Sequence, residues 1–263
     1  MFAIAALFAY SISLALIIPT LLLRKERAWR RFAILFAVIA LIFHIMTLQQ
    51  RFQAQGGMQN LSLLNIISLV SLLICAIMTI VASRNHGWLL LPFVYGFALV
   101  NLIFGTFVPD VFITHPRTTP AMMVHIGLAL FAYSVLIIAA LYALQLAWID
   151  HRLKSRKLAF NNDIPPLMSI ERKMFHITQI GMLLFTMVLF SGWFYPGDLF
   201  NRENINKVVL TLSAWLVYSI LLWGHRYRSW RGLRVVWFNC CGALLLTVAY
   251  FGSRVLQHFL TSS

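Results

Sequence analysis

Histidine is the residue type in this chain best suited to bind a metal or a cofactor. Eight histidines are present, and three of them, His86, His115 and His151, fall in polar stretches where water solvates them. The other five fall within or at the edges of long apolar runs, namely His44, His125, His176, His225 and His258. A neutral imidazole is a common metal ligand, and two imidazoles can hold a haem iron from opposite faces. Each histidine taken alone has a simpler interpretation, which is a hydrogen bond to a neighbouring helix.

A cation accompanies one of these histidines. Arg254 lies four residues before His258, so on a helix the two side chains share one face. Haem is apolar apart from its propionates, which need only a few cations or hydrogen-bond donors, and Arg254 is a candidate partner for one of them. The alternative interpretation of Arg254, an anchor at the membrane interface, fits the sequence equally well.

Other chemistries lack the residues that they need. Cys75, Cys240 and Cys241 lie in apolar runs without a CxxC or CxxCH pattern, which argues against a disulfide framework and against covalent c-type haem attachment. All seven acidic residues fall in loops or at the ends of apolar runs, whereas ion-coupled transporters usually carry a carboxylate inside the membrane. The sequence has no HExxH, phosphate-loop lysine motif or serine–histidine–aspartate set. We therefore expect a binding protein and no enzyme.

The composition predicts the kind of secondary structure that carries these side chains. The chain has 263 residues, of which 61% are hydrophobic and 11% charged, and its mean hydropathy is +0.83. A soluble domain carries about 25% charged residues, so this chain is expected in a lipid bilayer. A helix needs about 20 apolar residues to cross the hydrocarbon. We predict an all-α bundle of eight transmembrane helices in a single transmembrane domain, 1–263, with spans near residues 2–23, 32–48, 61–82, 88–108, 121–149, 174–195, 208–223 and 235–260.

The basic residues predict the orientation of these helices. The formal net charge is +14, and 16 of the 21 Lys and Arg residues follow the first, third, fifth and seventh runs. Positive charge concentrates on the cytoplasmic side, so both termini are expected outside. This rule explains the basic patches more simply than binding of nucleic acid does. The first run precedes its basic residues, which predicts an uncleaved span rather than a signal peptide.

This orientation sorts the membrane histidines by depth. His44, His125 and His258 fall toward the outer leaflet, whereas His176 and His225 fall at the inner ends of their spans. Several imidazoles at matched depth, without acidic residues beside them, favour a haem site near the outer surface over unrelated helix–helix hydrogen bonds.

Four stretches of the chain carry a more specific pattern. They are Met122-Met123-Val124-His125 with Ala132-Tyr133-Ser134; Ile180 to Thr186 with Ser191-Gly192-Trp193; Lys207 to Trp215 with Tyr218, His225, Arg231 and Gly232; and Ala249-Tyr250-Phe251-Gly252 with His258. Together they resemble the cytochrome c assembly membrane proteins, a haem-handling family that includes CcsA, CcmC and CcmF. The resemblance covers roughly residues 87–260.

The resemblance implies a non-covalent, b-type haem in a bacterial inner-membrane protein, with other membrane proteins of cytochrome assembly as partners. His125 and His258 fall where the family has its two external haem-ligand histidines. His225 falls where some members have a histidine deeper in the bilayer, and His44 is a further candidate without a counterpart. The sequence departs from the family at the tryptophan-rich outer loop, whose place is taken by Trp-Phe-Tyr-Pro-Gly-Asp-Leu-Phe at residues 193–200.

The sequence leaves three functions open. The first is a haem-binding membrane protein of cytochrome c assembly or haem handling. The second is an accessory or regulatory membrane subunit that kept the scaffold and lost the haem, which the altered loop suggests. The third is a small-solute transporter, which the absence of buried acids and of inverted repeats disfavours.

Overall fold

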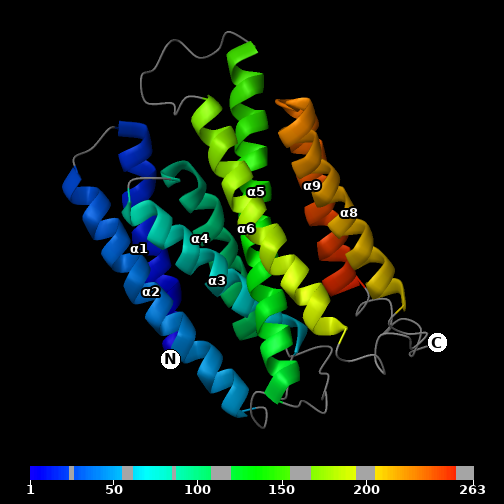
Figure 1. Ribbon diagram of the computed structural model, residues 1–263. Coiled ribbons are helices and arrows are strands. Elements are labelled where there is room, and N and C mark those ends of the chain that lie inside the picture. The colour runs from blue at the N-terminus through cyan, green and yellow to red at the C-terminus, as the bar shows by residue number, and fades with distance from the viewer. Residues whose placement is uncertain are drawn as a thin grey trace. The chain divides into compact units, whose positions relative to one another are not determined.

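The computed structural model describes residues 1–23, 27–54, 62–84, 87–107, 120–154, 167–193 and 205–252. Regular structure within these ranges is helical, which confirms the all-α prediction. The helices are α1 (Phe2–Leu23), α2 (Arg27–Ala54), α3 (Leu63–Ser83), η1 (Trp88–Leu90), α4 (Leu91–Phe107), α5 (Pro120–Lys154), α6 (Leu167–Gly192), α8 (Ile205–Arg228), α9 (Leu233–Thr247) and η2 (Val248–Gly252) (Figure 1).

The helices group into two compact units. Unit 1 comprises residues 1–119 and holds α1 to α4 with the short 3-10 helix η1. Unit 2 comprises residues 120–263 and holds α5, α6, α8 and α9 with the π-helix η2. The predicted single domain over 1–263 stays a prediction.

The predicted membrane spans are confirmed in number within the described ranges, where eight helices are long and apolar enough to cross a membrane. Their bounds extend past the predicted runs at polar ends: the run 32–48 lies within Arg27–Ala54, and the run 208–223 within Ile205–Arg228. Hydropathy marks only the hydrocarbon core, whereas a helix continues into the interface, where charged side chains are solvated. The last run, 235–260, is helical up to Gly252, and its remainder lies outside the described residues. The outward placement of both termini stays a prediction.

Small side chains bring α1 and α2 of unit 1 together. Ala6 and Ser13 on α1 and Ala33 and Ala37 on α2 are all buried. The Ser13 hydroxyl donates a hydrogen bond across to the Ala33 carbonyl at 2.9 Å. Helices in lipid gain no hydrophobic free energy when they associate. Close packing of small residues and such hydrogen bonds therefore hold the pair together.

Consecutive helices of unit 2 run antiparallel, and side-chain contacts define their register. His125, near the start of α5, contacts Ser191 at the end of α6. Phe175, near the start of α6, stacks on His225 near the end of α8. Each helix therefore carries residues to both ends of the unit, and residues far apart in sequence meet there.

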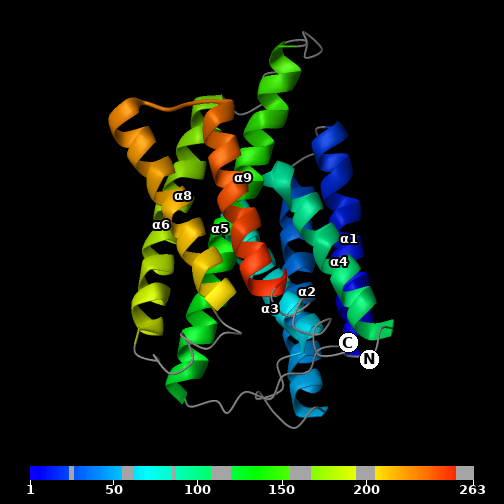
Figure 2. The same ribbon diagram turned by 90° about the vertical axis from the view of Figure 1, so that its right-hand side faces the viewer.

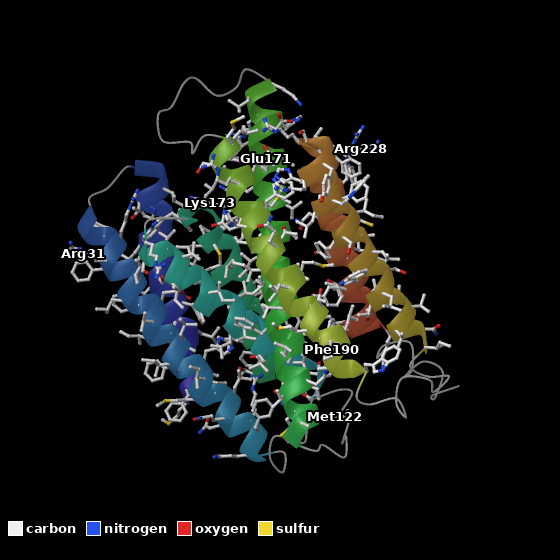
Figure 3. The ribbon with its side chains drawn as sticks, in the orientation of Figure 1. Arg31, Met122, Glu171, Lys173, Phe190 and Arg228 are labelled. Carbon is white, nitrogen blue, oxygen red and sulfur yellow. The ribbon has the colours of Figure 1, made fainter. Side chains whose placement is uncertain are left out.

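Figure 3 shows the two ends of unit 2 through labelled side chains. Met122 and Phe190 lie at one end, which we call the Ser191 end. Glu171 and Arg228 lie at the other, which we call the Glu171 end. The positive-inside prediction places the Ser191 end on the outer side of the membrane.

A tight turn joins α8 to α9, which lie side by side in Figure 2. Ser229 and Gly232 in this turn have positive φ values of 50° and 68°, a backbone region that favours glycine. Beyond the turn, the fully buried ring of Tyr218 on α8 rests against Gly242 on α9. The Tyr218 hydroxyl donates to the carbonyl of Asn239 at 3.4 Å. The α8–α9 pair therefore depends on the lack of a side chain at residue 242.

We expect Gly242→Ala to destabilise the protein. A Cβ atom at residue 242 would lie 2.7 Å from the nearest ring carbon of Tyr218, whose side chain is enclosed on all sides. Overpacking of this kind costs about 1–3 kcal/mol, so the midpoint of thermal unfolding in detergent should fall. Gly127→Ala on α5 is the matched control, because a Cβ there meets nothing within 4 Å. Equal midpoints for the two variants would contradict the packing described.

Candidate functional site

His125 lies at the Ser191 end of unit 2, with its ring orientation fixed by a hydrogen bond. Its Nδ1 is 2.7 Å from the Ser191 hydroxyl oxygen. The same hydroxyl lies 2.9 Å from the Val188 carbonyl. When its proton points to that carbonyl, the oxygen accepts from Nδ1–H of His125 and the neutral ring has its lone pair on Nε2. A histidine whose Nδ1–H is held by a second residue and whose Nε2 is unprotonated is the usual form of a metal-ligating histidine.

A cluster of aromatic rings fixes the end of α9 against α5 in the same unit. Tyr133 on α5 lies 5.4 Å from the ring of Tyr250 and 5.9 Å from the ring of Phe251, both in the π-helix η2. The hydroxyl of Thr247 lies 2.7 Å from the Ala243 carbonyl and 2.9 Å from the Tyr133 hydroxyl, so a hydrogen bond joins Tyr133 on α5 to Thr247 on α9. These contacts place the end of the described α9–η2 segment against α5, two helical turns from His125.

Two of the predicted site residues, Arg254 and His258, lie outside the described residues. The predicted pairing of His258 with His125 as axial ligands therefore stays a prediction.

His225 lies at the Glu171 end of unit 2. Its ring stacks on Phe175 with 3.4 Å between centroids and an interplanar angle of 17°. Its Nδ1 is 3.2 Å from the backbone carbonyl of Trp230. A carbonyl only accepts, so Nδ1 carries the proton and the neutral ring again has its lone pair on Nε2. The ring is thus held in a form suited to bind a metal or to accept a hydrogen bond.

The structure separates His225 from His125. Along α6, the contact of Phe175 with His225 and the contact of Ser191 with His125 are 16 residues apart. At the helical rise this corresponds to ~24 Å. The two histidines are therefore too far apart to ligate one iron, and His225 would belong to a second position along the unit.

His44 lies in unit 1 and is fully buried. Its Nδ1 is 3.3 Å from the Tyr10 hydroxyl, and its Nε2 is 2.9 Å from the Ser68 hydroxyl. The Tyr10 ring in turn lies 5.5 Å from the ring of Tyr95. Both imidazole nitrogens are thus engaged between three helices, as expected of a polar residue that joins helices in lipid. A ligand role for His44 stays a prediction, and it would require one of these hydrogen bonds to break.

The structure also reveals partners that sequence reasoning missed. The candidate histidines are oriented by Ser191, Phe175 and the Trp230 carbonyl. These contacts depend on the register between helices, which hydropathy does not predict. Ser191 has one sequence signal, its place beside Gly192 in the stretch that resembles the family. His176 lines a cavity at the Glu171 end with His225. Within the described part of the chain, no group of three or more His, Cys, Asp or Glu side chains is arranged to hold a metal ion.

The fold of apolar helices and the motif around His125 define a class of membrane protein. The chain matches the Cytochrome C assembly protein family over residues 29–261, and it belongs to that family. The match covers the resemblance at residues 87–260 and extends it through α2 and α3 of unit 1.

Among individual proteins, the chain is similar to the inner membrane protein YpjD of Escherichia coli. It is 63% identical to this protein from strain K12 and from O157:H7, over 261 residues that make up 99% of this chain and 99% of each relative. The expected multi-pass location in the bacterial inner membrane is thereby confirmed. No solved structure matches the chain.

We expect His44→Ala to lower stability without removing a ligand. The change leaves the buried hydroxyls of Tyr10 and Ser68 without their imidazole partner, which costs about 1–3 kcal/mol. The unfolding midpoint in detergent should fall, while bound haem per folded molecule should match that of the wild type. His151→Ala, at the exposed end of α5, is the control for loss of an imidazole. Loss of haem from well-folded His44→Ala protein would instead identify His44 as a ligand.

Proposed function

We propose that this chain binds haem non-covalently at the Ser191 end of unit 2 and serves in cytochrome c assembly or haem handling. His125 and His258 are the proposed axial ligands. The observation that carries the proposal is the position of His125 at this end of the unit, with its Nδ1 oriented by the Ser191 hydroxyl 2.7 Å away, as second residues orient metal-ligating histidines. Membership of the cytochrome c assembly family supports the same function.

The direction of the helices supports the pairing with His258. His125 lies eight residues before Tyr133, and His258 lies eight residues after Tyr250, the ring that packs on Tyr133. Because α5 and α9 run antiparallel, the start of α5 and the end of η2 at Gly252 both lie on the Ser191 side of this contact. Eight residues can span ~12 Å as a helix and more when extended, which is enough for a chain to reach the level of His125.

Other residues present suit the same group. The rings of Tyr133, Tyr250 and Phe251 give unit 2 an aromatic layer beside the proposed site, which suits an apolar macrocycle. Arg254, four residues before His258, is the proposed partner of a haem propionate. Bound haem would supply an iron whose oxidation state follows its ligands and its burial. The role proposed for the protein is binding and handling, without catalysis by its own side chains.

His225 is proposed to serve a second position on the route of the haem. Its Nδ1–H is held by the Trp230 carbonyl, and it lies near the opposite end of the unit from His125. A haem that approached from the Glu171 end would meet His225 before it reached His125. Partners in cytochrome assembly are part of this proposal.

A second candidate function rests on the altered outer loop. Residues 193–200 replace the family's tryptophan-rich segment, and that segment is associated with transfer of haem. Its replacement favours storage or sensing of haem over delivery to an apocytochrome. In the extreme case the chain is an accessory membrane subunit without haem, which would be colourless when purified and would co-purify with a membrane partner.

We expect protein purified from haem-replete cells to show a haem absorption band. His125→Ala combined with His258→Ala should abolish the band, because both proposed axial nitrogens are removed. His151→Ala should retain it, since that histidine lies at the far end of α5. A full band in the double variant would overturn the proposed ligands, and colourless wild-type protein bound to a partner would favour the accessory subunit.

We expect Ser191→Ala to weaken haem binding while leaving His125 in place. Without the hydroxyl, Nδ1–H of His125 loses the acceptor that fixes its tautomer and orientation. Loss of such a residue typically lowers metal affinity about 10–100-fold, which titration of the haem-depleted protein would measure. Ser191→Thr keeps the hydroxyl and should bind as the wild type does. Equal affinity of the alanine and threonine variants would contradict the orienting role of Ser191.

A further inference from the structure

A cavity of about 310 Å³ opens at the Glu171 end of unit 2. Its lining comes from the first three turns of α6, from the end of α8 and from the turn that follows α8. The lining residues are Met168, Glu171, Arg172, Phe175, His176, Gln179, His225 and Arg231. This volume is in the range of small-molecule sites, which are typically ~300–1,000 Å³ and carry a few convergent polar groups.

The cavity contains both hydrogen-bond donors and acceptors. Arg172 and Arg231 supply guanidinium groups, which are suited to a phosphate because they donate in a planar fork. His225 supplies its Nε2 lone pair, because its Nδ1–H is committed to the Trp230 carbonyl. A purely anionic ligand would use the arginines and leave the acceptors unused.

Glu171 is the second acceptor, and one of its oxygens lacks a partner. Its Oε1 atom is buried and accepts no hydrogen bond within the part of the chain that the structure describes. A buried carboxylate oxygen is costly unless a donor or a cation meets it. Glu171 lines this cavity together with Arg172 and Phe175, and we expect its missing partner to come from a ligand bound there.

The cavity lies at the level where a membrane helix leaves the hydrocarbon. Trp223 and Tyr227, near the end of α8, are exposed as expected of an interfacial aromatic belt. Charged residues occupy the second turn of α6, Glu171 to Lys173, and the last turn of α8 at the same end of the unit. Phospholipid headgroups occupy this level, and basic pockets between membrane helices are known sites for their phosphates.

We propose that this cavity binds a phosphate ester that also carries a primary ammonium group, as the headgroup of phosphatidylethanolamine does. The phosphate pairs with Arg172 and Arg231, and the ammonium donates to Glu171 Oε1 and to His225 Nε2. A headgroup with a quaternary ammonium has no N–H to donate and leaves both acceptors unsatisfied. The proposal does not depend on haem binding, because it rests on the donors and acceptors that line the cavity.

The test compares two lipids that differ only in the methyl groups on nitrogen. Full-length protein in detergent is mixed with phosphatidylethanolamine and phosphatidylcholine of matched acyl chains, and native mass spectrometry counts each retained lipid. We expect about a tenfold preference for the ethanolamine lipid, the effect of one charge-assisted hydrogen bond. Glu171→Gln should remove most of this preference, and Arg172→Ala with Arg231→Ala should lower retention of both lipids.

Arg228→Ala is the matched control, since Arg228 lies at the same end of unit 2, stacks over Trp223 and does not line the cavity. Soluble O-phosphoethanolamine distinguishes the source of the ligand: displacement of the lipid at low concentration supports the same chemistry with a soluble ligand, and failure to displace it supports the lipid. Circular dichroism confirms that each variant is folded. Equal retention of the two lipids by the wild type, or unchanged preference in folded Glu171→Gln, would overturn the proposal.

Discussion

Lipid offers no hydrogen bonds to the polar groups that a membrane helix buries, and unit 2 satisfies several of these groups in a repeated way. Hydroxyl side chains donate their proton to a carbonyl in their own helix and then accept a hydrogen bond from the next helix. Thr178 and Thr186 accept from the side chains of Asn239 and Trp215, respectively. Ser191 and Thr247 are placed in the same way against His125 and Tyr133. Each hydroxyl thereby holds the side chain opposite it.

This arrangement gives the histidines different capacities. His225 commits its Nδ1–H to a backbone carbonyl, which only accepts, so its neutral ring keeps the lone pair on Nε2. His125 is oriented through Nδ1 by the Ser191 hydroxyl. His44 joins helices of unit 1 through both nitrogens, which contact Tyr10 and Ser68.

The two ends of unit 2 also differ in chemistry. The Ser191 end combines His125 with apolar and aromatic side chains, which suits a large macrocycle with few charges. The Glu171 end combines acceptors with arginines around a small cavity, which suits a compact ligand with both a donor and an anion. Because antiparallel helices carry residues to both ends, one set of four long helices supports both environments.

The sequence by itself determined the number of membrane helices, their approximate spans and the family, because composition and local motifs are properties of the chain alone. It also singled out His125 and His225. Only the tertiary structure decided which residues hold Nδ1 of His125 and His225, that both nitrogens of His44 are hydrogen-bonded, and that Glu171 lines a cavity with two arginines. The physical reason is the register between helices. Ser191 is 66 residues from His125 in the sequence, and Ser68 is 24 residues from His44. Hydropathy does not predict the axial or rotational position of one helix against another.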